Sequence, residues 1–122
     1  MIKFKSLNQS KQFLRILKKK RLNTKYFTIY FEKNSSKIKK NDRKILNISF
    51  VMKKIIGNAV KRNKIKRKLK AAVTKLIKDK NIIDLNYNYI VFGKSNAYKE
   101  KFASIVKEMS ITFKKIKQKN IN

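Results

Sequence analysis

The most constraining feature of this chain is a long amphipathic segment, residues 58–79, in which basic residues begin before the apolar stripe does. Apolar residues recur there at helical spacing, at Ile65, Leu69, Ala72, Val73 and Leu76. The first turns instead hold the basic run GNAVKRNKIKRKLK of residues 57–70. Because burying a cation without a partner is costly, we expect the later turns to pack on a core while the first turns extend beyond it.

The charge balance indicates a polyanionic partner. The 122 residues include 35 Lys and Arg but only 6 Asp and Glu, for a formal net charge of +29. A charge of this size destabilises a compact protein by self-repulsion unless a polyanion neutralises it. With 42% hydrophobic residues, the chain is too apolar for a disordered basic tail. We therefore expect a folded basic domain that binds nucleic acid.

Composition also excludes several kinds of catalytic and metal site. The chain has no Cys and no His, which excludes thiol nucleophiles, thiolate metal sites and the commonest general base. The acidic residues are scattered and form no paired-carboxylate or metal-binding motif: Glu32, Asp42, Asp79, Asp84, Glu100 and Glu108. No apolar stretch is long enough for a membrane span or a signal peptide, so we expect no membrane association and a cytoplasmic location.

Residue patterns predict one α+β domain over residues 1–122, with the last few residues disordered. We expect a helix over 10–20, strands over 26–31 and 46–52, the long helix, a strand over 87–92 and a final helix from about residue 96. A polar loop is expected over 34–43, and a short additional strand would fit around 38–45. Helices on one side of a small sheet give an α-β sandwich.

Arg62 has an unusual position on the long helix. At about 100° per residue, it falls in the same angular sector as Ile65 and Leu69, one turn nearer the helix start. We expect it to point into a groove or toward an anion. The free N–H groups and dipole of a helix N-terminus favour phosphate, and Gly57 would let the backbone approach such a group closely.

Other polar residues of the same helix suit phosphate or base contacts. Asn63 supplies both a donor and an acceptor, and Arg67 supplies a planar guanidinium fork. For Lys61, Lys64 and Lys68, an alternative is a solvated basic face with no binding role.

Aromatic residues cluster in the first predicted helix and strand. In the strand, Tyr26 and Tyr30 point one way while Phe27 and Phe31 point the other, so one set should be core. The other set, with Phe13, is either ordinary core or a stacking surface for unpaired bases. Basic residues interleaved with aromatic residues favour single-stranded RNA over duplex DNA.

The run KKIIGNAVKRNKIKR at residues 53–67 resembles the signature of the protein subunit of bacterial ribonuclease P. Two further segments are similar to strands of that family, KYFTIY at 25–30 and NYIVFGK at 88–94. The resemblance implies an α-β sandwich of the ribosomal protein S5 domain 2-like type. It has about four strands with helices and a left-handed βαβ crossover around the basic helix.

The resemblance also implies a function. The family's protein is the non-catalytic partner of a catalytic RNA, and together they remove the 5′ leader of precursor tRNA as an endoribonuclease. We therefore expect one protein per RNA, with Mg²⁺ held mainly by the RNA. The residues implied to bind RNA are Lys53, Lys54, Lys61, Arg62, Asn63, Lys64, Lys66, Arg67 and Lys70. Those implied to line the leader cleft are Phe13, Leu17 and Tyr30.

Some positions depart from the family pattern. Lys64 stands where Arg is usual, Leu17 replaces an aromatic residue of the cleft, Ser6 stands where Arg is usual, and Asn96 replaces a frequent Pro. The glycine usual in the strand before Lys53 is also absent. Three alternatives remain on sequence alone: a structural, ribosomal-type RNA-binding protein, a stand-alone nuclease, and a nonspecific DNA-compacting protein.

Overall fold

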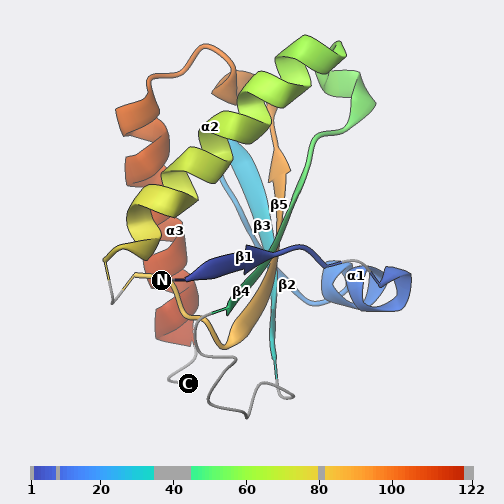
Figure 1. Ribbon diagram of the computed structural model, residues 1–122, viewed down its shortest axis with the longest axis vertical. Helices are drawn as coiled ribbons and strands as arrows, with labels where there is room; N and C mark the ends of the chain where they lie inside the picture. The colour runs from blue at the N-terminus through green and yellow to red at the C-terminus, as the bar shows by residue number, and fades with distance from the viewer. Residues whose placement is uncertain (1, 8, 35–44, 80–81, 120–122) are drawn as a thin grey trace.

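The computed structural model describes residues 2–7, 9–34, 45–79 and 82–119, and these form one layered α+β domain (Figure 1). Within them are five strands and three α-helices. In chain order the elements are β1 (Lys3–Lys5), α1 (Ser10–Leu17), β2 (Lys20–Asn23), β3 (Phe27–Lys33), β4 (Ile45–Val51), η2 (Lys54–Ile56), α2 (Ala59–Ile77), β5 (Tyr87–Gly93), η3 (Ser95–Ala97) and α3 (Phe102–Lys119). The α+β class predicted from the sequence is confirmed.

The sheet has the strand order β1-β4-β5-β3-β2, so a strand from late in the chain lies at its centre. β5 pairs with β4 in parallel and with β3 antiparallel, and α2 forms the crossover between β4 and β5. The register places both Ile48 and Phe31 opposite Tyr89. Because alternate residues of a strand point to opposite faces, this register builds one continuous apolar face across the sheet.

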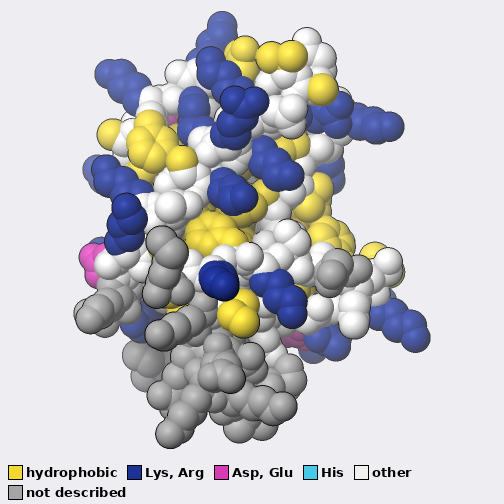
Figure 2. Space-filling view, viewed as in Figure 1, with side chains coloured by type: hydrophobic (Ala, Val, Ile, Leu, Met, Phe, Trp, Pro, Cys, Tyr) yellow, Lys and Arg dark blue, Asp and Glu magenta, His cyan; other side chains and the backbone are white. Residues whose placement is uncertain are grey.

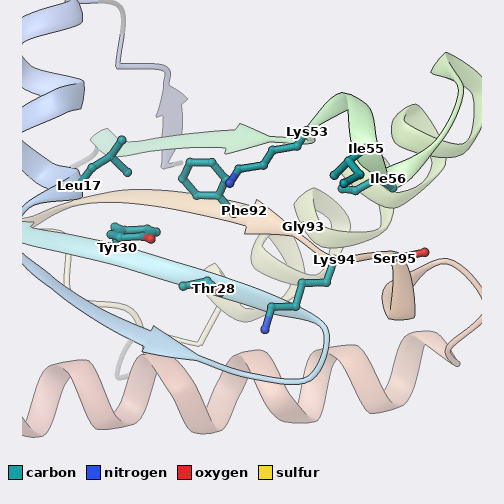
Figure 3. Close-up of a pocket in the computed structure, with 10 residues that line it drawn as sticks. All are labelled: Leu17, Thr28, Tyr30, Lys53, Ile55, Ile56, Phe92, Gly93, Lys94 and Ser95. Atoms are coloured by element: carbon teal, nitrogen blue, oxygen red, sulfur yellow. The ribbon is translucent and has the colours of Figure 1, made fainter.

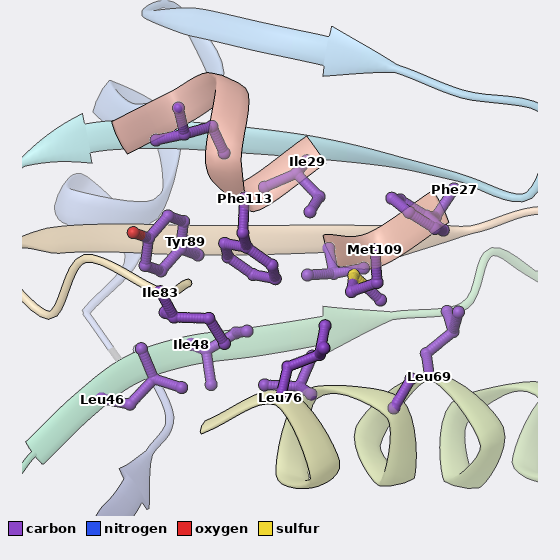
Figure 4. Packing of buried hydrophobic residues seen from close by; sticks show 14 of the residues in the cluster. Phe27, Ile29, Leu46, Ile48, Leu69, Leu76, Ile83, Tyr89, Met109 and Phe113 are labelled. Atoms are coloured by element: carbon purple, nitrogen blue, oxygen red, sulfur yellow. The ribbon is translucent and has the colours of Figure 1, made fainter. Parts of the chain in front are cut away.

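The main core fills the space between that face and helices α2 and α3 (Figure 4). The apolar stripe predicted for α2 is confirmed, because all five of its residues are buried: Ile65, Leu69, Ala72, Val73 and Leu76. From α3, Phe113 packs edge to face against Tyr89, with ring centroids 5.1 Å apart. Burial of these large apolar side chains is the main force that holds α2 at a fixed place on the sheet.

Helix α1 lies against the opposite face of the sheet. Ile16 of α1 and Ile90 of β5 are fully buried but stand outside the main core cluster. Arg15 donates two hydrogen bonds to the Glu32 carboxylate, at 2.7 and 2.9 Å, and Glu32 points away from the face that its neighbour Phe31 shares with the core. The prediction that the helices lie on one side of the sheet is therefore wrong.

Other boundaries differ from the sequence prediction for local reasons. The strands β1 and β2 were not predicted because both are short, mostly exposed edge strands without an alternating apolar pattern. Their addition gives five strands in place of about four, and β2 shortens the first helix. α3 begins at Phe102 and not near residue 96 as predicted. Residues 95–101 form η3 and a turn, although the apolar residues among them continue the spacing of the helix that follows.

Three predicted features lie almost wholly outside the described residues: the polar loop over 34–43, the additional strand around 38–45, and the disordered C-terminal end. Among the described helices, none has the length and apolar character that crossing a membrane requires.

Candidate nucleic-acid interface

Gly57 and Asn58 build the start of α2. Gly57 has φ of 149°, a conformation that favours glycine, and a Cβ there would lie 2.9 Å from Cδ of Lys61. The Asn58 side chain accepts a hydrogen bond from the Lys61 backbone N–H at 2.9 Å and so caps the helix. The first turn contains no acidic residue, so the positive end of the helix dipole is not neutralised locally.

The first turns of α2 extend beyond the core, as the sequence predicted. Ile65 is the first buried residue of the helix, while Val60 is 74% exposed and Ile55 of η2 is 91% exposed. Gly93 allows β5 to pack closely against its neighbours here, because a Cβ at this position would clash with Sδ of Met52 and would lie 3.0 Å from Cγ2 of Ile65. Before Ile65, the side chains of α2 are exposed or only half-buried.

One set of cations on α2 faces the loop that joins β5 to α3, residues 94–101. Lys61 Nζ donates to Ser95 Oγ at 2.8 Å and lies 5.3 Å from the centroid of the Tyr98 ring. Lys64 Nζ lies 5.0 Å from the same centroid. A third lysine donates to backbone carbonyls of the loop. We call this set the loop-facing row: Lys61, Lys64 and Lys68.

A second set of cations lies on the other side of α2, toward β4 and β1. We call it the edge-facing row: Arg62, Lys66 and Lys70. Lys66 and Lys70 line a hollow of about 320 Å³, whose walls include the rings of Phe4, Phe13 and Phe50. The Nε of Arg62 is buried and has no hydrogen-bond partner among the described residues. A buried N–H without a partner is costly, so within the described chain nothing offsets the burial of this group.

The surface around α2 is strongly cationic. Figure 2 shows Lys and Arg side chains following α2, with apolar side chains exposed between them and acidic ones sparse. Asn63 and Arg67 are both exposed on this helix, farther from the core than Arg62, which is half-buried. The predicted binding residues of α2 thus share one helix but not one environment.

A separate cleft opens on the sheet face that α1 covers only in part. Its volume is about 730 Å³, and its floor includes Tyr30 and Phe92, whose rings pack edge to face with centroids 5.5 Å apart (Figure 3). Leu17 of α1 forms one wall, and Ile55 and Ile56 of η2 form another. The cleft is mainly apolar and aromatic, and it is wide enough for a nucleobase or similar flat group.

Two lysines line this cleft in different ways. Lys53 Nζ lies 5.3 Å from the centroid of the Phe92 ring, a cation–π contact at the rim. Lys94 Nζ donates to Oδ1 of Asn23 and to the carbonyl of Thr24, so it ties the end of β5 to the turn between β2 and β3. Lys53 is therefore the rim cation better placed to meet a phosphate.

The structure divides the residues predicted for the leader cleft. Leu17 and Tyr30 line the cleft together, but Phe13 lines the hollow beside Lys66 and Lys70. Phe13 and Leu17 are one turn apart on α1, so the two concavities are neighbours along this helix. Of the remaining predicted cations, Lys53 lines the cleft, and Lys54 is exposed on η2.

Several residues of these concavities were not predicted. Phe92 and Phe50 each line one of them, and so do Lys94 and Phe4. Strand alternation held a signal for Phe92, because Tyr89 and Val91 point into the core and Phe92 must point the other way. No comparable signal existed for Phe4, because its strand was not recognised.

Two of the described acids have partners and line neither concavity. Glu32 pairs with Arg15, and Glu100 accepts hydrogen bonds from the Lys101 backbone N–H and from the Tyr26 hydroxyl, each at 2.9 Å. The bond from the Lys101 N–H, followed by that from Tyr26, lowers the pKa of the Glu100 carboxyl below its ordinary value of 4.5. Among the described residues, none that lines the cleft or the hollow is acidic.

The arrangement is suited to binding nucleic acid. Cations at the rims of aromatic concavities can hold phosphates while the rings stack on bases. Within the described ranges, no group of three or more acidic residues could hold a metal ion, as a two-metal nuclease would require.

Known proteins provide an independent comparison. The family model "Ribonuclease P" matches residues 1–117. A curated ribonuclease P protein component from Carboxydothermus hydrogenoformans is 24% identical over 119 residues, which cover 97% of this chain and 96% of the relative. A Staphylococcus aureus RNase P protein, a mutant with defective mRNA degradation activity, superposes with a TM-score of 0.73 at 25% identity, over 92% of this chain and 87% of that one. The Thermotoga maritima RNase P protein gives a TM-score of 0.70 at 22% identity, over 91% and 96%.

Proposed function

The chain belongs to the ribonuclease P protein family, and from this premise we propose how it acts in the tRNA-processing endoribonuclease of which it is a component. In this proposal the protein binds the catalytic RNA subunit through α2 and holds the 5′ leader of precursor tRNA in the cleft beside α1. One protein joins one RNA, and the protein itself breaks no bond.

We assign the contacts with the catalytic RNA to the start of α2, with Lys54 of η2 beside it. The edge-facing row supports this assignment, because Arg62 has a buried Nε without a partner in the described chain. Asn63 and Arg67 are exposed next to this row and can reach the same RNA. Phosphate contacts of this kind dominate affinity and make binding steeply dependent on salt.

We assign the leader to the cleft that contains Tyr30 and Leu17. The rings of Tyr30 and Phe92 offer a stacking floor, and Lys53 lies at its rim. A single strand leaving this cleft along α1 would pass Phe13 and reach Lys66 and Lys70. The observation that carries the proposal is that an aromatic cleft and a cationic hollow are lined by residues one turn apart on α1, a spacing that suits an unpaired strand better than a rigid duplex.

We place catalysis in the RNA subunit, and Mg²⁺ with it. The scattered acids of the described chain do not fit a metal site, and neither His nor Cys is present to act as base or nucleophile. The protein's part is then to bind, to orient the leader and to reduce phosphate repulsion within the complex through its field.

Reconstitution tests this function. The protein is added to a bacterial ribonuclease P RNA and a precursor tRNA at low Mg²⁺, and release of the 5′ leader is measured. We expect cleavage at the mature 5′ end that needs the RNA and is accelerated by the protein. Cleavage by the protein alone would overturn the proposal in favour of a stand-alone nuclease. Binding without acceleration would indicate a purely structural RNA-binding protein.

A further inference from the structure

Lys68, in the loop-facing row, is bonded unlike the other described cations of α2. Its Nζ donates to the backbone carbonyl oxygens of Ala97, Tyr98 and Glu100, at 2.9, 2.9 and 2.8 Å. An ammonium group has three donors, so these carbonyls satisfy it completely. Its partial burial lowers the pKa of Lys68, and the nearby charge of Lys64 lowers it further.

The loop that Lys68 binds has a defined internal structure. The amides of Ala97 and Tyr98 donate to the carbonyls of Lys94 and Ser95, each at 3.0 Å, and Ala97 is fully buried. At the far end of the loop, the Glu100 carboxylate accepts from Tyr26 at the start of β3. Lys68 thus holds a folded loop against α2 while Glu100 attaches the same loop to the sheet.

The loop in turn supports the rest of the row. The Tyr98 ring lies beneath both Lys61 and Lys64, and the Ser95 hydroxyl accepts from Lys61. Two ammonium groups over one ring repel each other, so their shared position depends on the ring being held in place. The Tyr98 side chain packs against the edge of the core, and the bonds from Lys68 add a direct tie between the backbone of this residue and α2.

We infer that Lys68 is a positioning residue: it fixes the Tyr98 loop so that Lys61 and Lys64 are presented together to RNA, and it makes no RNA contact itself. The inference rests on the proposed function for the role of Lys61 and Lys64. Its structural half, that Lys68 fixes the Tyr98 loop, does not depend on RNA binding, whereas its functional half, that the loop presents Lys61 and Lys64 to RNA, does. Arg should not replace Lys68, because a planar guanidinium cannot direct its donors to three converging carbonyls.

The structural half is tested on the free protein with matched variants. Lys68→Met and Lys66→Met remove the same charge from the same helix, but only the first removes these bonds. We expect Lys68→Met to accelerate hydrogen exchange at the amides of Ala97 and Tyr98 by more than about tenfold and to lower the thermal midpoint by about 5 °C. Lys66→Met should change neither, and Lys68→Arg should behave like Lys68→Met. Equal effects of the two methionine variants, or full rescue by Arg, would overturn the inference.

The functional half is tested by a mutant cycle, with affinity for a bacterial ribonuclease P RNA measured well below the unfolding temperature. We expect Lys68→Met to weaken binding about 3- to 10-fold in the wild-type background but less than about twofold in the Lys61→Met/Lys64→Met background. Lys66→Met should weaken binding by the same factor in both backgrounds. An equal loss from Lys68→Met in both would show that Lys68 contacts RNA directly, and no loss in either would show a purely structural role; both results contradict the inference.

These outcomes are distinguishable from failure of the proposed function. If the wild-type protein bound the RNA but did not accelerate leader removal, the cycle would still report on Lys68. If it bound no RNA, the exchange and thermal measurements would still accept or reject the structural half, and the functional half would be refuted with the proposed function.

Discussion

The two rows of cations on α2 carry the same charge but differ in what their side chains contact. In the loop-facing row, Lys61 and Lys64 lie over Tyr98, and Lys68 donates to backbone carbonyls. In the edge-facing row, Arg62 keeps a buried Nε without a partner in the described chain, and Lys66 and Lys70 line an open hollow. Cations on one helix therefore have different surroundings, because the loop supplies acceptors to one row and the described part of the chain supplies none to the buried Nε in the other.

This difference bears on how the protein tolerates its net charge of +29. Cation–π contacts and bonds to carbonyls offset part of the repulsion on the loop-facing side. For the edge-facing row the described part of the chain shows no such contacts, and under the proposed function RNA would offset the repulsion. We therefore expect the edge-facing row to contribute to RNA affinity at the expense of stability, and the loop-facing row to contribute to both.

The largest expected effect comes from Arg62→Ala. It should weaken binding to a bacterial ribonuclease P RNA by about 1–3 kcal/mol, because under the proposed function a guanidinium that contacts phosphate is lost. Its thermal midpoint should stay unchanged or rise, since removing an unpartnered buried N–H costs no hydrogen bond within the described chain. Filter binding and calorimetry measure the two quantities.

Lys75→Ala is the matched control for Arg62→Ala, because Lys75 is an exposed cation in the last turn of α2. It should leave RNA affinity nearly unchanged. If Arg62→Ala left RNA affinity unchanged at both low and moderate salt, the proposed role of the edge-facing row in RNA binding would be contradicted.

An intermediate effect is expected on the salt dependence of binding. The pair Lys66→Met/Lys70→Met should reduce the slope of log K against log salt by about 1.4–1.8, as expected for two phosphate contacts. The pair Lys61→Met/Lys64→Met should reduce the slope by a similar amount but also lower the thermal midpoint, because its cation–π contacts are lost.

Binding titrations over a range of salt, with parallel thermal unfolding, separate the two pairs. An unchanged slope for the loop-facing pair would mean that its lysines only stabilise the fold. A lower thermal midpoint for Lys66→Met/Lys70→Met would mean that these two lysines also form stabilising contacts within the protein.

The smallest expected effect is a decrease in thermal stability at acid pH, caused by protonation of Glu100 in the loop that joins β5 to α3. The pKa of Glu100 is lowered in the folded protein by bonds from the Lys101 N–H and the Tyr26 hydroxyl. A carboxyl with a lowered pKa stabilises the fold above its ordinary value of 4.5, and this contribution is lost as pH falls through the folded-state value. Thermal midpoints of the wild type and Glu100→Gln should therefore differ at neutral pH and converge in acid.

Tyr26→Phe serves as a second variant for that measurement, because it removes one bond to the carboxylate and leaves the charge. Its pH profile should lie between the other two. Parallel profiles for all three proteins down to the most acid pH would contradict the assignment to Glu100.

Much of the fold could be predicted because its main elements have regular apolar patterns. The stripe of α2 and the alternation of β3 and β4 are local signals, and the structure places their residues in the core. The prediction failed at β1, β2 and the start of α3. The two edge strands have mostly exposed residues, and Tyr98 follows the spacing of α3 while packing beneath lysines of α2.

The candidate site was predictable as a list of residues but not as an arrangement. The basic run identified the cations of α2, and the structure separated them into two rows with different partners. It also placed Phe13 with Lys66 and Lys70 and not with Leu17 and Tyr30. Assignment of these residues to RNA and leader stays a prediction that the binding experiments address.

The sequence by itself determined the charge, the amphipathic helix, the family signature and the absence of His and Cys, because each is a property of composition or of spacing along the chain. Only the tertiary structure decided which cations are bonded to other parts of the described chain. A hydrogen bond depends on acceptors brought within reach from elsewhere, and the acceptors of Lys68 lie about thirty residues away in sequence. Their approach is set by how α2 packs on the sheet, which no local pattern encodes.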